Sequence, residues 1–154
     1  MDYGDRGFWA YDVALDIFVK HLIDAAEASD EAGTTWLCAA ITDWRKTASI
    51  ADIGLSLDPA WPASQRQVFI NLASDACAML AKRESISAEE IIAWPMLDDL
   101  RIYPRGVSEV FTAPLIELGR AVVALVAGTL PDAPKGRAWF YGTDTGRQTI
   151  GMSS

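Results

Sequence analysis

The sequence predicts a mainly α-helical fold, a single-domain bundle of about five helices with a small C-terminal β-hairpin or short sheet. Apolar residues recur at alternating steps of three and four in successive segments, which glycines and prolines separate. The end of the chain turns aromatic and strand-like around a glycine-rich turn. We therefore expect a single domain of 154 residues: an N-terminal arm at 1–9, a helical core at 10–128, and a loop and β-like tail at 129–154.

The first helix is expected from about Ala10 to Ala28. Its apolar and acidic residues lie on opposite faces, and Asp16 precedes Lys20 by four residues, the favoured order for an ion pair. The apolar stripe consists of Tyr11, Leu15, Phe18, Leu22 and Ala25. The opposite face carries Asp12, Asp16, Lys20, Asp24 and Glu27.

The second helix is expected to begin near Thr34 or Thr35, both of a residue type that caps helix N-termini. It should end around Gly54, which suits a left-handed C-terminal cap. The segment 58–62 contains two prolines and is expected to be a connector, because such close prolines cannot continue a helix.

The third and fourth helices have clear starts. Ser64 should cap a helix that runs to about Arg83. Ser87 followed by Glu90 forms a capping box for a short helix, which Pro95 should stop at the preceding residue.

The fifth helix is expected over 112–127, with Pro114 in its first turn and Gly128 at its end. It is apolar on nearly all sides, so we expect it at the centre of the bundle. Before it, the irregular segment 97–106 contains residues that could form one short strand around Ile102.

The tail is expected to form a hairpin. Residues 139–141 are strand-like, 142–146 form a turn, and 148–150 could return as a second strand. An isolated two-stranded hairpin is marginal in water, so it should pack on the helices and could pair with the strand near Ile102.

The charge and the cysteines limit the class of protein. The net charge is −8, with 12 acids and 5 bases in residues 1–77, so direct binding to nucleic acid is not expected. The two cysteines, Cys38 and Cys77, should be free thiols rather than a secreted disulfide framework. No apolar segment has the length of a signal peptide or a membrane span, so we expect a cytoplasmic protein that does not bind membranes.

Catalytic and metal sites are not indicated. The chain has one histidine, His21, and no pattern of cysteine or histidine pairs at ligand spacing. His21 should lie at the edge of the core, with no local nucleophile beside it. We therefore expect no catalytic residue, no metal and no cofactor.

Asp12, Asp16, Asp24 and Glu27 are candidate partner-binding residues, because an acidic helix face speeds association with a basic protein. The alternative is that this is a plain solvated face.

Six residues are candidates for a ligand-binding patch. They alternate along two segments, which would place them on one face if the segments paired as strands, and arginines beside aromatic rings suit an anion or a flat ring. The alternative is that the aromatic rings dock the hairpin while the arginines pair with Asp98, Asp99 and Glu109. The six are Arg101, Tyr103, Arg105, Arg137, Trp139 and Tyr141.

These observations favour a non-enzymatic, acidic protein-interaction domain. A bacterial immunity or inhibitor protein that binds a basic partner would have this size and charge. The alternative is a small domain or enzyme that binds an anionic ligand through the arginine–aromatic patch. A homo-oligomer is also compatible with the sequence.

Overall fold

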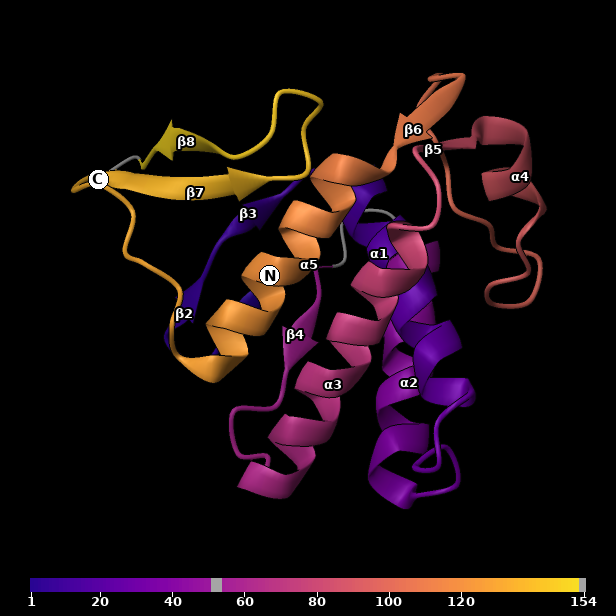
Figure 1. Ribbon diagram of the computed structural model, residues 1–154, viewed down its shortest axis with the longest axis horizontal. Helices are drawn as coiled ribbons and strands as arrows, with labels where there is room; N and C mark the ends of the chain where they lie inside the picture. Colours follow the sequence, from indigo (N-terminus) through magenta and orange to yellow (C-terminus); the bar gives the residue numbers. More distant parts are fainter. Residues whose placement is uncertain (51–53, 153–154) are drawn as a thin grey trace.

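The computed structural model describes residues 1–50 and 54–152, and five helices form about half of this part of the chain (Figure 1). They are α1 (Asp12–Glu27), α2 (Thr35–Ser49), α3 (Ala63–Leu80), α4 (Ala88–Ala93) and α5 (Thr112–Ala127). The mainly α-helical prediction is confirmed, with each helix close to its expected position. None of the helices in the described ranges is long and apolar enough to cross a membrane.

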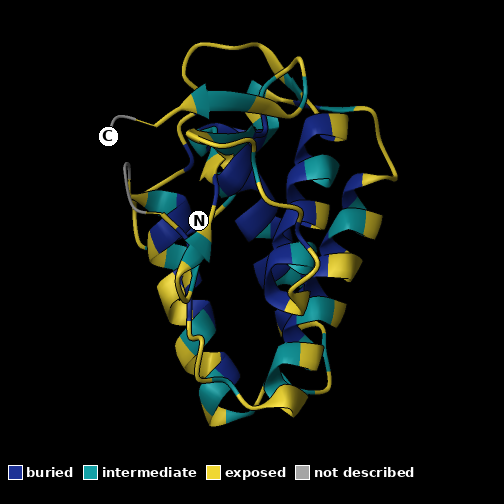
Figure 2. Ribbon diagram, turned by 90° about the vertical axis from the view of Figure 1, so that its left-hand side faces the viewer, coloured by how far each residue is buried: buried dark blue, intermediate teal, exposed yellow. Residues whose placement is uncertain are grey.

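The central helix is α1, not α5 as expected. It packs against α2, α3 and α5, whereas α5 packs against α3 and α1. Ile116 and Val123 leave one side of α5 only partly covered. The neighbouring helices therefore bury only part of the apolar surface of α5. Figure 2 shows that the buried sides of the helices face one another.

Short strands join the helices at their ends. The strands β2 (Arg6–Gly7), β1 (Asp2–Tyr3) and β4 (Ser56–Leu57) form one sheet in that order. A second pairs β5 (Ser85–Ser87) with β6 (Glu109–Phe111), antiparallel. The predicted N-terminal arm thus contributes strands, which its mixed composition did not indicate.

The C-terminal hairpin is present, as β7 (Arg137–Tyr141) and β8 (Gln148–Gly151). On the side away from β8, β7 pairs with the parallel strand β3 (Trp9–Ala10), to the left in Figure 1. The expected pairing of the hairpin with the segment near Ile102 is therefore wrong. That segment is not a strand, because the backbone turns at Asp98 and Arg105, both with positive φ.

Most predicted helix ends are confirmed. Ser87 Oγ accepts a hydrogen bond from the Glu90 N–H (3.1 Å), and Gly128 ends α5 in the left-handed conformation. Two predictions are wrong. The backbone is already extended at Ile50, so Gly54 does not cap α2, and Pro62 rather than Ser64 precedes α3.

Candidate functional site

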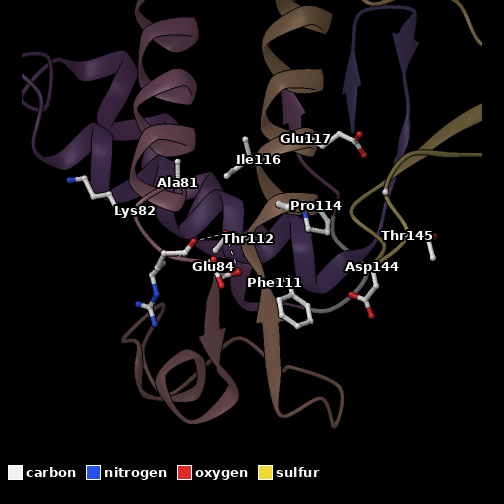
Figure 3. A pocket seen from close by; sticks show the side chains of 13 residues that line it. Ala81, Lys82, Glu84, Phe111, Thr112, Pro114, Ile116, Glu117, Asp144 and Thr145 are labelled. Atoms are coloured by element: carbon white, nitrogen blue, oxygen red, sulfur yellow. Dashed lines mark hydrogen bonds between the residues drawn. The ribbon is translucent and has the colours of Figure 1, made fainter.

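A large hollow lies where the end of α3, the start of α5 and the β7–β8 loop meet (Figure 3). We call it the α3–α5 groove. Its volume is about 890 Å³. Its lining consists of residues 81–84, 111–114, 116–117 and 144–146.

The walls of the groove are tied together by Thr112, the first residue of α5. Its buried hydroxyl donates a hydrogen bond to the Arg83 carbonyl (2.6 Å), and its N–H donates to the Glu84 carbonyl (2.9 Å). These bonds join the start of α5 to the turn that follows α3. Because both lie at the ends of packed helices, this part of the groove is pre-organised.

An exposed aromatic side chain lines the groove where it adjoins a second hollow. Phe111, the last residue of β6, is 51% exposed. Together with Pro114 and Asp144 it also lines a neighbouring hollow of about 220 Å³, so the concave surface continues past its ring. An exposed aromatic between two hollows is typical of an anchor point for a partner.

Acidic side chains dominate the charge of the groove. Glu117 and Asp144 lie on one side and Lys82 on the other, with Glu84 between them (Figure 3). Arg83 also lines the groove, but both of its terminal nitrogens bind the Glu90 carboxylate (2.7 and 3.0 Å).

One oxygen of the Glu117 carboxylate lacks a hydrogen-bond donor. Its Oε1 is buried and has no hydrogen-bond partner among the described residues. Gly146 lies against it, because a Cβ built on that glycine would be 3.3 Å from Oε1. A buried carboxylate oxygen without a donor is unfavourable, so a cationic donor that reached it would be bound favourably.

Of the four acids predicted on α1, Asp12, Asp16 and Asp24 are half-buried and Glu27 is exposed. The Arg105 guanidinium donates to Asp12, Lys20 binds Asp24 (2.5 Å), and Arg45 binds Glu27. Trp94 lies over the Lys20 ammonium at 4.5 Å. The loop that follows α4 therefore covers much of this face, which is less solvated than its sequence pattern indicated.

Asp16 differs from the other α1 acids. Burial, together with the negative charge of Asp12, raises the pKa of its carboxyl to about 8, although Arg105 opposes the rise. At neutral pH this side chain is mostly protonated, so it adds little negative charge to the surface.

His21 lies at the edge of the core, as predicted. It is buried, its Nδ1 donates to the Ile17 carbonyl (2.8 Å), and its ring meets Trp94 edge-on. Burial lowers the pKa of the imidazole, with the Ile17 hydrogen bond opposing that effect.

The first three of the six patch residues lie in the loop before β6. Arg101 donates to the Asp98 and Leu100 carbonyls (3.0 and 2.8 Å), Tyr103 is 70% exposed, and Arg105 binds Asp12.

The other three lie in β7. Arg137 donates to Thr149 on β8, and the Trp139 indole donates to the Pro131 carbonyl (2.8 Å). Tyr141 is buried against Phe8. Because the two segments do not pair, the expected common strand face does not form, and ligand binding by these residues stays a prediction.

No sequence pattern predicted the groove. Phe111, Glu117 and Asp144 come from a strand end, a helix and a turn, so no spacing along the chain connects them. The chemistry that they offer is the binding of a cationic group beside an apolar one.

Within the described ranges no three His, Cys, Asp or Glu residues are grouped as metal ligands. Comparisons of the chain with protein-family models, with curated proteins and with solved structures find no match.

Proposed function

We propose that this protein is a non-enzymatic interaction domain, a single-domain helical bundle that binds a basic segment of a partner protein in the α3–α5 groove. The observation that carries the proposal is the exposed ring of Phe111, which lines a hollow together with Glu84, Glu117 and Asp144. An apolar anchor of the partner would cover the ring, and a neighbouring lysine or arginine would meet the carboxylates.

The overall charge supports a basic partner. The net charge of −8 would speed the approach of a cationic protein by long-range attraction. We place the contact in the groove rather than on α1, because Asp12, Asp24 and Glu27 are already ion-paired within the chain. Asp12, Asp24 and Glu27 then contribute only to long-range steering, and Asp16, which is mostly protonated at neutral pH, adds little to it.

Selection from a random peptide library, followed by fluorescence polarisation, tests this proposal. We expect the selected peptides to combine lysine or arginine with an aromatic or large aliphatic residue. Phe111→Ala should weaken their binding about tenfold or more, because a buried aromatic anchor contributes about 2 kcal/mol. Raised salt should weaken binding as well.

Ile92→Ala is the matched control, because Ile92 is also 51% exposed but lies on α4 outside both hollows. The Ile92→Ala variant should bind the selected peptides as tightly as the wild type does. Selected peptides that were acidic, or that bound Phe111→Ala as tightly as the wild type, would contradict the proposal.

The alternative proposal is a small anionic ligand bound by the arginine–aromatic residues. The observation in its favour is that Tyr103 stands exposed in one loop with Arg101 and Arg105. A thermal-shift screen of anionic metabolites tests it: stabilisation of the wild type that Arg101→Ala abolishes would support it, and no stabilisation by any of them would count against it.

A further inference from the structure

A separate pocket lies at the other end of α3 from the groove, where the start of α2 faces the segment that leads into α3. Its volume is about 300 Å³. Trp36 and Trp61 form its walls, with the buried Trp44 between them, and Asp43 and Asp58 lie at its rim. We call it the tryptophan pocket.

The spacing of residues on α2 builds one side of the pocket. Trp36, Ala39, Ala40 and Asp43 follow at steps of three, one and three, which places them on one face of the helix. The two alanines are too small to fill the space between the indole and the carboxylate. A hollow therefore remains beside the indole.

A turn fixes the other side of the pocket. Asp58 Oδ1 accepts the Ala60 N–H (2.8 Å), and the Asp58 carbonyl accepts the Trp61 N–H (3.2 Å). The Trp61 ring packs on the buried Phe69, with the ring centroids 5.5 Å apart. The indole and the carboxylate on this side are thus held in place before any ligand arrives.

The chemistry of the pocket suits a cation whose charge is surrounded by alkyl groups. The rings of Trp36 and Trp61 lie 5.4 Å apart at 71°, so they form a corner with two aromatic walls. Indole faces attract cations, tryptophan most strongly of the aromatic residues.

The carboxylates add full negative charge to this corner. Asp43 has no ion pair or side-chain hydrogen bond in the described part of the chain, and Asp58 uses only Oδ1. No lysine or arginine is among the described residues that line the pocket. A strongly hydrated bare ion would gain little from the indoles, whereas an alkylated ammonium group can contact both the rings and the carboxylates.

We propose that the tryptophan pocket binds an alkylated ammonium group, either a free trimethylammonium compound or a methylated lysine side chain, in the corner that the indoles of Trp36 and Trp61 form, beside Asp43 and Asp58. The pocket shares no residue with the α3–α5 groove, so this inference does not depend on the proposed function.

Two-dimensional NMR of the indole N–H groups tests the proposal, with Trp36→Phe and Trp61→Phe assigning the two signals. Choline should shift both signals and saturate, while its uncharged analogue 3,3-dimethyl-1-butanol, of the same shape, should shift them much less. An equal response to both compounds, or no response to choline at up to about 50 mM, far above a millimolar Kd, would overturn the proposal.

Conservative variants distinguish the effect of the two pocket carboxylates on choline binding from the effect of the protein's overall charge. Asp43→Asn and Asp58→Asn should each weaken choline binding about two- to fivefold, and the second keeps the oxygen that holds the turn. Asp75→Asn, an exposed position later on α3, removes the same charge and should bind like the wild type. Equal weakening in all three variants would overturn the proposal.

A peptide that carries trimethyllysine distinguishes the two sources. Binding tighter than that of choline identifies a protein side chain, and weaker binding identifies a free compound. Equal affinity for the trimethyllysine peptide and for the same peptide with unmodified lysine would overturn the assignment of an alkylated group.

Discussion

At the scale of single residues, burial changes the chemistry of an aspartate that the sequence presents as a surface charge. Asp16 lies on the central helix, half-covered, with its pKa raised to about 8. In the unfolded chain the pKa is near 3.8. Between these values the folded protein keeps a proton that the unfolded chain releases, so the stability falls as the pH rises through this window.

Asp16→Asn should remove this pH dependence, because the amide resembles the protonated carboxyl and never ionises. We expect the variant to gain stability relative to the wild type by about 3–4 kcal/mol between pH 5 and pH 8. Urea denaturation across this range measures the difference. Parallel stability curves for the two proteins would contradict the pKa of the buried carboxyl.

A glycine on α5 marks the closest approach between helices. A Cβ at Gly119 would collide with the Cys77 sulfur on α3 and lie 2.7 Å from the Phe18 ring on α1. Both neighbours belong to packed helices and cannot withdraw freely.

Gly119→Ala should therefore destabilise the protein by about 1–3 kcal/mol, although alanine is the better helix former by about 1 kcal/mol. Chemical denaturation measures the effect. Gly33→Ala is the control, since a Cβ there has no atom within 4 Å, and it should leave the stability almost unchanged. A Gly119→Ala variant more stable than the wild type would show that the helices can separate at low cost.

At the scale of elements, the C-terminal hairpin shows how a marginal unit becomes stable. It adds to β3 rather than standing alone, and the Tyr11 N–H donates to the Tyr141 carbonyl (2.9 Å) at the start of α1. The Tyr141 ring meets Phe8 edge-on, with centroids 4.9 Å apart. These contacts connect the two ends of the described chain.

Tyr141→Ala should destabilise the protein by about 3 kcal/mol, because it leaves a cavity beside Phe8. Hydrogen exchange should show that the Tyr11 amide loses protection first. Thr149→Ala on β8 is the control and should change stability by less than about 1 kcal/mol. Retained protection at Tyr11 in the Tyr141→Ala variant would mean that the hairpin docks without this ring.

At the scale of the whole molecule, α3 separates the two candidate binding sites. Gln65 lines the tryptophan pocket and Ala81 the α3–α5 groove, and sixteen residues of helix correspond to about 24 Å. Sites at this distance with no shared residue are expected to bind their ligands independently.

Saturating choline should therefore change the Kd of a groove-binding peptide by less than about twofold. Fluorescence polarisation with and without choline measures this. Competition between choline and the peptide would mean that both bind at one site rather than at two.

The sequence by itself determined the helices and most of their ends, because apolar spacing, prolines, Gly128 and the Ser87 cap act over a few neighbouring residues. It also determined the hairpin and the position of His21 at the edge of the core. Local chemistry alone is enough for these features.

Only the tertiary structure decided which helix is central, that β7 pairs with β3, and that Asp16 is half-covered with a raised pKa. The same is true of the α3–α5 groove and of the corner between Trp36 and Trp61. These features depend on contacts between residues far apart in the chain. Such contacts form when the helices bury their apolar faces against one another, and the spacing of residues within a single helix does not determine which faces meet.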